Sequence, residues 1–213
     1  MGGVVLKVSG RERLDPLQQY IFMVNHQSNV DIPVLVQSVE SFQLRWIAKR
    51  ELLWIPFFGW AMWASKHITV ERTNRFKAVK SLQRARERIA AGISVVVFPE
   101  GTRSRDGRLL RFKKGGFLLA VAANRPIVPV TINGSRQVLP AGAWRLRAGT
   151  IEVIIGQPVP IAGFRPGNLR HLSAQVREEI EKQLRSPGPE PAATVTNPGQ
   201  SIIGNSPLQK RSI

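Results

Sequence analysis

The sequence predicts an α/β fold with a mostly parallel central sheet flanked by helices. Seven short segments have strand-like patterns, and helical patterns lie between several of them. Alternating strands and helices favour parallel pairing, because two parallel strands need a long crossover between them. With 213 residues, the chain is long enough for one domain with a sizeable core.

The expected strands are short and mostly apolar. Tyr20–Val24 is apolar throughout and is expected to be a buried strand. The full set of expected strands is Val4–Val8, Tyr20–Val24, Leu44–Ile47, His67–Glu71, Ile93–Phe98, Ile127–Asn133 and Thr150–Ile155.

Four segments are expected to be helical. The first begins near Ile32–Val36, with Pro33 close to its first position. The second has one apolar stripe and is expected to end at Gly92; its stripe consists of Phe76, Val79, Leu82, Ala85 and Ile89. Residues 115–126 are apolar nearly all round, which predicts a buried helix that ends before Pro126. Residues 168–184 form a final amphipathic pattern.

Composition predicts one domain and a tail. Residues 1–185 are expected to form the domain, and residues 186–213, rich in Pro, Gly, Ser and Asn, are expected to be disordered. The absence of cysteine excludes disulfides, thiolate metal sites and a cysteine acyl-enzyme. The net charge of +17 indicates an anionic partner, which could be nucleic acid, anionic lipid or a phosphorylated small molecule. A solvated basic surface is the alternative.

Residues 52–64, LLWIPFFGWAMWA, contain no charge or hydroxyl and carry three of the five tryptophans. The segment is too short to span a bilayer, which takes about 20 apolar residues. A buried core segment and a membrane-interface segment both fit, because Trp and Phe favour the interface. Any membrane contact is therefore expected to be peripheral.

A polar turn, NHQSNVD, separates the strand Tyr20–Val24 from the first expected helix. In a turn from a strand into a helix, His26 and Asp31 can meet although they are five residues apart. The carboxylate would then accept a hydrogen bond from one imidazole nitrogen and leave the other as a base. The alternative is that Ser28, Asn29 and Asp31 cap the helix and His26 is incidental.

A second polar segment, FPEGTRSRDGRLLRFKK, follows the strand that ends at Phe98. Gly101 would let the backbone approach a ligand closely, and Arg103 would offer a planar fork of donors to phosphate oxygens. Ligand sites of α/β proteins gather at the carboxyl ends of strands, which favours a phosphate site over an ordinary basic loop.

Several other chemistries lack their motifs. The sequence contains no G-x-S-x-G elbow, no His-Glu-x-x-His set, no Walker loop and no G-x-G-x-x-G fingerprint after a strand. The three histidines are far apart, so no metal site and no cofactor is expected.

Four blocks in this order resemble the glycerolipid acyltransferases, specifically the 1-acyl-glycerol-3-phosphate acyltransferase family. NHQSNVD matches the family's His-x-x-x-x-Asp block and FPEGTRS its third block, while ITVERTNR and IVPVTING resemble the second and fourth. AKRELLWIPFFGWAM and RFKKGGFLLA also resemble bacterial members. The resemblance covers about Val5 to Arg185.

The resemblance implies transfer of a fatty acyl group from acyl-CoA or acyl carrier protein to the 2-hydroxyl of lysophosphatidic acid, giving phosphatidic acid. His26 would take the hydroxyl proton, since an imidazole with a pKa near 6.5 is a suitable base at neutral pH. Asp31 would orient it and stabilise the imidazolium. Backbone amides near the turn at Ser28 and Asn29 are candidate donors to the oxyanion.

The substrate phosphate would be held by arginines from the second and third blocks. The residues expected at this subsite are Arg72 and Arg103, with Lys49 as a weaker candidate and Glu100, Gly101 and Thr102 shaping the pocket. A different acceptor, such as glycerol-3-phosphate or another lysolipid, is the alternative.

Two features depart from the family pattern. Many members carry a hydrophobic segment before the histidine block, and His26 comes too early for one, so either the protein is a peripheral form or its start has been trimmed. Glu71 stands where members often have aspartate. We expect a peripheral protein on the cytoplasmic face of the membrane.

A nucleic-acid-binding module would also explain the charge. Such a module interleaves exposed aromatic side chains with arginines, whereas most tryptophans here lie in the charge-free segment 52–64. No nucleic-acid partner is therefore expected.

Overall fold

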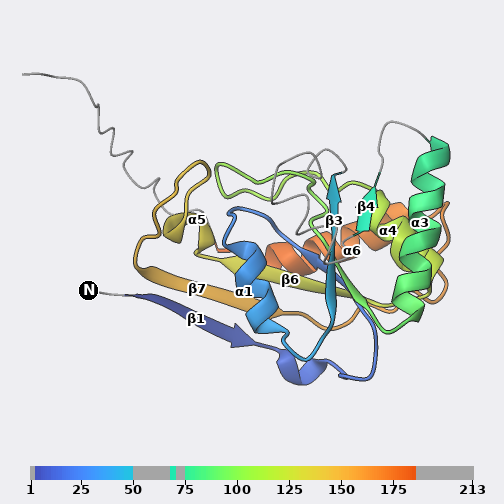
Figure 1. Cartoon of the computed structure of the whole chain (residues 1–213), viewed down its shortest axis with the longest axis horizontal. Helices are drawn as coiled ribbons and strands as arrows, with labels where there is room; N and C mark the ends of the chain where they lie inside the picture. Colours follow the sequence, from blue (N-terminus) through green and yellow to red (C-terminus); the bar gives the residue numbers. More distant parts are fainter. Residues whose placement is uncertain (1–2, 50–67, 71–74, 186–213) are drawn as a thin grey trace, which may run out of the picture.

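The computed structural model describes residues 3–49, 68–70 and 75–185 (Figure 1). The expected tail 186–213 and the Trp- and Phe-rich segment 52–64 lie outside the described residues, as does Arg72.

The centre of the molecule is a seven-stranded sheet in the order β1-β7-β6-β2-β5-β3-β4. Neighbouring strands are parallel, except that β6 and β7 are antiparallel. The predicted mostly parallel sheet is confirmed, and every strand overlaps a segment expected from the sequence. The strands are β1 (Val4–Ser9), β2 (Ile21–Val24), β3 (Leu44–Lys49), β4 (Ile68–Val70), β5 (Ser94–Val97), β6 (Ile127–Asn133) and β7 (Gly149–Ile155).

The four expected helices are present as well. They are α1 (Asp31–Ser38), α3 (Arg75–Ala90), α4 (Gly115–Ala123) and α6 (Leu169–Gln183). Helix α4 ends at Ala123, and its C-cap Asn124 has a left-handed backbone with φ of 50°, two residues before Pro126. Two short helices, η1 (Arg11–Arg13) and α5 (Ser135–Val138), were not predicted, because three or four residues show no helical periodicity.

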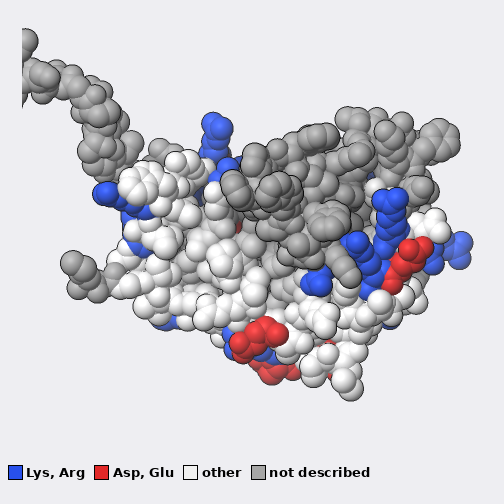
Figure 2. Space-filling view, viewed as in Figure 1, with Lys and Arg blue, Asp and Glu red and all other residues white. Residues whose placement is uncertain are grey.

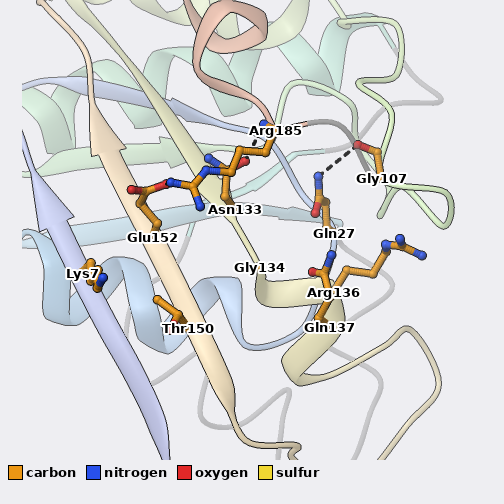
Figure 3. A pocket seen from close by; sticks show the side chains of 10 residues that line it. All are labelled: Lys7, Gln27, Gly107, Asn133, Gly134, Arg136, Gln137, Thr150, Glu152 and Arg185. Atoms are coloured by element: carbon orange, nitrogen blue, oxygen red, sulfur yellow. Dashed lines mark hydrogen bonds and ion pairs between the residues drawn. The ribbon is translucent and has the colours of Figure 1, made fainter. Parts of the chain in front are cut away.

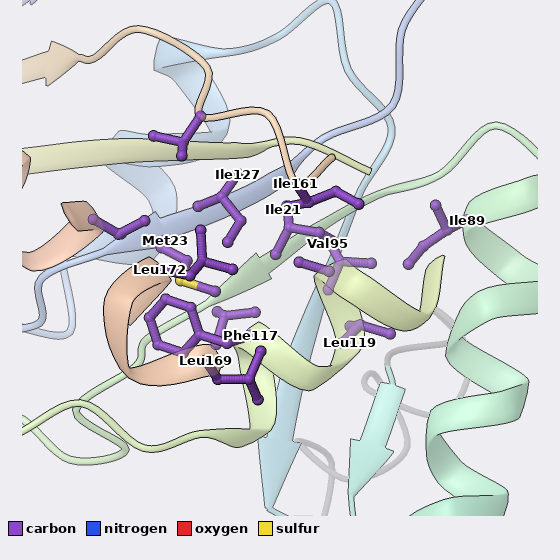
Figure 4. Close-up of a cluster of buried hydrophobic side chains, with 14 of the residues drawn as sticks. Ile21, Met23, Ile89, Val95, Phe117, Leu119, Ile127, Ile161, Leu169 and Leu172 are labelled. Atoms are coloured by element: carbon purple, nitrogen blue, oxygen red, sulfur yellow. The ribbon is translucent and has the colours of Figure 1, made fainter. Parts of the chain in front are cut away.

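Helices cover both faces of the sheet, and alternate residues of β2 enter two separate cores. Ile21 and Met23 pack with residues of α3, α4 and α6 (Figure 4). Phe22 and Val24 point to the other face and pack with residues of α1, β6 and β7. Strands covered on both faces are apolar throughout, which explains the unbroken apolar runs of β2, β5 and β6.

The carboxyl ends of β2, β5 and β6 lie at one edge of the sheet, so the loops that follow them are neighbours. Asn25 fixes the first of these ends, since its side-chain amide donates to the carbonyl of Ile132 at 2.9 Å and accepts its N–H at 2.7 Å. The N–H of Ser104 donates to the carbonyl of His26 at 2.7 Å and joins the loops after β2 and β5. This edge therefore holds the two polar segments side by side.

Candidate active site

The turn after β2 brings His26 and Asp31 into contact, as predicted. Nδ1 of His26 lies 2.8 Å from Oδ2 of Asp31. The same oxygen accepts the N–H groups of Gln27 and Ser28, each at 2.8 Å. Asp31 is fully buried, whereas the imidazole keeps 14% of its surface exposed. The carboxylate is thus held by three donors, and of the two side chains in the pair only the imidazole of His26 is in contact with solvent.

This contact defines which nitrogen of His26 can react. A carboxylate at Nδ1 favours the tautomer with the proton on that atom and leaves the lone pair on Nε2. The ring also stacks on Phe98, with ring centroids 3.9 Å apart and planes inclined by 16°. Stacking and hydrogen bond together fix the imidazole, so that Nε2 can serve as a base in one orientation.

Helix capping does not explain these polar residues. The N-cap of α1 is Val30, and the helix has no side-chain capping bond. Asp31 is instead the first residue of the helix, and its carboxylate binds N–H groups that precede the helix. The hydrogen-bonded pair is therefore the interpretation that the structure favours.

The expected oxyanion donors need a correction. The N–H of Ser28 donates to Asp31 and is not available to an oxyanion. The hydroxyl of Ser28 is also used, because it donates to the carbonyl of Leu139 at 2.7 Å. Of the two amides suggested by the sequence, only that of Asn29 stays a candidate.

Glu100, in the loop after β5, binds the backbone of the histidine turn. It is only 2% exposed, and its two oxygens accept the N–H groups of His26 at 2.9 Å and Leu110 at 2.8 Å. Burial raises the pKa of this carboxyl, while the two backbone N–H groups partly oppose the shift. Glu100 thus holds the backbone at His26 and at Leu110, and its expected role in shaping a phosphate pocket stays a prediction.

Gly101 allows the loop after β5 to turn close to the side chain of Lys113. Its φ is 73°, in the left-handed region that favours glycine. A Cβ built there would lie 2.8 Å from Nζ of Lys113, so a side chain would displace that lysine. The residue is therefore needed for the loop itself, and a ligand-approach role stays a prediction.

Thr102 and Arg103 line an open cavity of about 600 Å³ beside the histidine turn. Nη1 of Arg103 donates to Oδ1 of Asn29 at 2.9 Å, which ties the arginine to that turn. Arg105 and Arg136 line the same cavity. Three guanidinium groups on one cavity favour an anionic ligand. We call this space the arginine cavity.

Arg136 is the functional candidate that the sequence did not reveal. It lies on α5 and is only 4% exposed, and its Nη1 is 3.5 Å from the carbonyl of Arg105. A buried arginine is uncommon, because charged side chains are mostly exposed and are fully buried only when they are paired. Nothing in the sequence distinguishes it from the other arginines, since its burial depends on a helix too short to predict.

A second cavity of about 360 Å³ lies between β1, the end of β6 and α5 (Figure 3). Gln27 borders it and donates to the carbonyl of Gly107 at 3.2 Å. An ion pair of 2.7 Å between Arg185 and Glu152 crosses its far side. Figure 3 shows the guanidinium of Arg136 turned away from this ion pair, toward the side of Gly107. The cavity is polar and adjoins the turn, and the one carboxylate among its lining residues, Glu152, is paired with Arg185.

The remaining predicted residues are less well placed. Lys49 is the last residue of β3, where its backbone pairs with Val70; its side chain is not described. Arg72 lies outside the described residues. Their phosphate-binding roles stay predictions.

Comparison with known proteins gives a consistent result. The model of the Acyltransferase family matches residues 5–133, from β1 to the end of β6. A 1-acyl-sn-glycerol-3-phosphate acyltransferase from Haemophilus influenzae is 34% identical over 182 residues, which cover 84% of this chain and 75% of the relative. The chain belongs to the 1-acyl-sn-glycerol-3-phosphate acyltransferase family.

A solved member of this acyltransferase family has the same fold. The crystal structure of the 1-acyl-sn-glycerophosphate acyltransferase from Thermotoga maritima matches with a TM-score of 0.69 and 34% identity, covering 85% of this chain and 73% of that one. The chain spans 46% of a Chlamydomonas reinhardtii relative to which it is 36% identical over 155 residues, or 72% of this chain. Of the helices in the described residues, none has the length and apolar character needed to cross a membrane.

Proposed function

We propose that this acyltransferase moves a fatty acyl group from a thioester to the 2-hydroxyl of 1-acyl-glycerol-3-phosphate and so forms phosphatidic acid for phospholipid synthesis. The observation that carries the proposal is the His26–Asp31 pair, in which the imidazole is 14% exposed and the histidine turn is tied to the arginine cavity by the Arg103–Asn29 bond. The base and the anion-binding groups occupy the same edge of the sheet, as transfer to a phosphorylated alcohol requires.

The reaction is a direct transfer. The hydroxyl oxygen attacks the thioester carbonyl carbon while Nε2 of His26 takes the hydroxyl proton. Asp31 stabilises the resulting imidazolium through Nδ1. The tetrahedral intermediate then breaks its carbon–sulfur bond, and the departing thiolate takes the proton back from Nε2. No acyl-cysteine is formed, since the chain contains no cysteine.

The acceptor phosphate would bind at the arginine cavity. Arg103 reaches the histidine turn through Asn29, so a phosphate held there leaves the glycerol hydroxyl near His26. Thr102 lines the same cavity and can donate its hydroxyl. Arg72 and Lys49 would add charge from the other loops, as the family resemblance suggests.

The donor would be acyl-CoA or acyl carrier protein. We also propose that the protein acts as a peripheral protein on the cytoplasmic face of a membrane, where both acceptor and product reside. The net charge of +17 supports attraction to an anionic surface and to an acidic carrier protein.

A thiol-release assay tests the proposal. Purified protein is mixed with oleoyl-CoA or oleoyl-acyl carrier protein, with and without lysophosphatidic acid in detergent micelles. His26→Ala removes the base, and His171→Ala is the matched control, because His171 is an exposed histidine on α6.

Thiol release that requires the acceptor, is lost in His26→Ala and persists in His171→Ala would support the proposal. Release without acceptor would identify a thioesterase. Release that requires glycerol-3-phosphate and does not occur with lysophosphatidic acid would show that glycerol-3-phosphate is the acceptor.

A further inference from the structure

The loop between α5 and β7 exposes large apolar side chains that the proposed reaction does not use. Trp144 is 81% exposed and Leu146 is 61% exposed. Arg145 lies between them and Arg147 follows, and both arginines are exposed as well. We call residues 143–148, AWRLRA, the Trp–Arg loop. Single exposed apolar side chains are ordinary on a protein surface. Here two large ones, Trp144 and Leu146, lie within three consecutive positions, and this concentration needs an explanation.

The loop is basic without any compensating acid. From Ser135 to Ile151 the chain contains three arginines and no Asp or Glu. The guanidinium carbon of Arg145 lies 4.4 Å from the ring centroid of Trp144, so the aromatic surface and the charge form one unit. Figure 2 shows basic side chains at the end of the molecule where this loop lies and also beside α3, while the acidic patches of this view are at the lower edge and beside α3.

The position of the loop relates it to the candidate active site. It begins directly after Pro140, Ala141 and Gly142, which line the arginine cavity together with Arg103. Figure 1 shows the segment between α5 and β7 extending beyond α5 at one end of the sheet. The strand that follows, β7, is antiparallel to β6, and this brings the loop to the edge where β2 and β6 end. The Trp–Arg loop therefore stands at the rim of the arginine cavity.

We propose that the Trp–Arg loop docks the protein on an anionic lipid bilayer. Trp144 and Leu146 enter the interfacial region, and Arg145 and Arg147 bind the phosphates of the headgroups. The loop thereby holds the mouth of the arginine cavity against the surface that contains the acceptor; this last step rests on the proposed function. Tryptophan with a flanking cation suits the interface, where one end of the ring system is apolar and the other is wet.

A lipid surface fits the loop better than an acidic protein does. The apolar residues project from a loop, and the exposed side chains alternate between apolar and cationic, which matches a layered interface with phosphates above acyl chains. A protein hot spot would instead be expected at a well-packed, desolvated pocket. An acidic carrier protein is the competing partner, and the experiment distinguishes the two.

Sedimentation with vesicles tests the proposal on the full chain. The vesicles are phosphatidylcholine alone or phosphatidylcholine with phosphatidylglycerol, and neither contains acceptor. Trp144→Ala/Leu146→Ala is expected to lower the partition coefficient on anionic vesicles on the order of tenfold. Arg145→Gln/Arg147→Gln is expected to lower it by about fivefold per arginine, with little effect on phosphatidylcholine vesicles.

Matched controls come from the opposite edge of the sheet. Leu17→Ala removes a leucine that is 86% exposed and precedes β2. Arg165→Gln/Arg170→Gln removes two exposed arginines near the start of α6. Both controls should bind anionic vesicles within about twofold of the unmodified protein. Loop variants that partition as the unmodified protein does, or controls that lose as much, would overturn the proposal.

Two further outcomes separate this inference from the proposed function. With a short-chain acceptor that stays monomeric in water, the loop variants should keep their rate of thiol release, and with acceptor embedded in anionic vesicles they should lose it. Equal loss on both acceptors would place the loop in the substrate site and overturn the docking role. Unchanged vesicle binding with weaker binding to acyl carrier protein would make the partner a protein. If no variant has acyltransferase activity, the vesicle measurement still decides the docking role.

Discussion

Oδ2 of Asp31 receives the imidazole Nδ1–H of His26 and the N–H groups of Gln27 and Ser28, all at 2.8 Å. One buried oxygen thus fixes the turn and the base together. The carboxylate has a structural role in the turn and, in the proposed reaction, a chemical role, and a single substitution affects both.

Asp31→Asn is expected to lower kcat by about 10²-fold or more, because His26 loses both its orientation and the charge that stabilises the imidazolium. The free energy of unfolding should fall by about 1–3 kcal/mol, since the amide can replace only part of the acceptor capacity of the carboxylate. Steady-state kinetics and urea denaturation measure the two effects.

His26→Ala is the companion variant, because it removes the base and leaves the N–H donors of the turn in place. It should lose about 10²–10⁴-fold in kcat with a smaller change in stability than Asp31→Asn. An Asp31→Asn protein with unchanged kcat would show that Asp31 serves only the turn.

The pH dependence of stability reports on Glu100. Burial raises its pKa above the ordinary value of 4.5, so the native carboxyl keeps its proton to a higher pH than the unfolded one. Between the two pKa values the native state binds more protons, and stability therefore falls as pH rises through that window. Glu100→Gln should remove this slope.

At neutral pH, Glu100→Gln should also destabilise the fold by about 1–2 kcal/mol, because one amide N–H₂ must face a backbone N–H of His26 or Leu110. Urea denaturation over a range from about pH 4 to 8 gives both results. If the stability of Glu100→Gln fell with rising pH as steeply as that of the unmodified protein, the pH dependence of stability would come from other groups.

Arg103→Ala is expected to raise the apparent KM for the phosphorylated acceptor by about 10-fold or more, since a charge-assisted bond is worth about 1.5–3 kcal/mol. Arg103→Lys should recover only part of this, because lysine lacks the planar fork.

Arg108→Ala serves as the control on the same loop, because the side chain of Arg108 is 81% exposed. Its KM should stay within about twofold of the unmodified value. If Arg103→Ala behaves like Arg108→Ala, the phosphate binds elsewhere.

Gly134 connects β6 to α5, the helix that carries Arg136. It has a φ of 84°, and a Cβ there would collide with the carbonyl oxygen of Thr150 on β7. Gly134→Ala should therefore destabilise the protein by more than the roughly 1 kcal/mol that a left-handed alanine costs.

Gly163→Ala provides the matched measurement, since Gly163 has a φ of 83° and open space around it. Gly163→Ala measures the cost in stability of a left-handed backbone alone. The difference between the two variants in thermal unfolding then gives the cost of the collision with Thr150. Equal losses would mean that β7 moves aside at little cost.

The local pattern was enough to predict most elements of the fold. Unbroken apolar runs predicted β2, β5 and β6, and the stripe before Gly92 predicted α3, because these signals depend only on neighbours in the chain. The helices η1 and α5 have no such signal. The antiparallel pairing of β7 with β6 also depends on contacts between strands, which the sequence does not specify by period.

The sequence by itself determined the family, the α/β class and the identity of the candidate base, because these depend on residue types in a fixed order. Tertiary structure decided how the side chains are used. It committed the Ser28 amide to Asp31, turned both oxygens of Glu100 to backbone N–H groups and buried Arg136 beside Arg103. The physical reason is that several of these contacts join residues far apart in the chain, 74 positions between His26 and Glu100 and 107 between Asn25 and Ile132. The Ser28–Asp31 bond spans only three positions, but it depends on the conformation of an irregular turn, and no local period records either kind of contact.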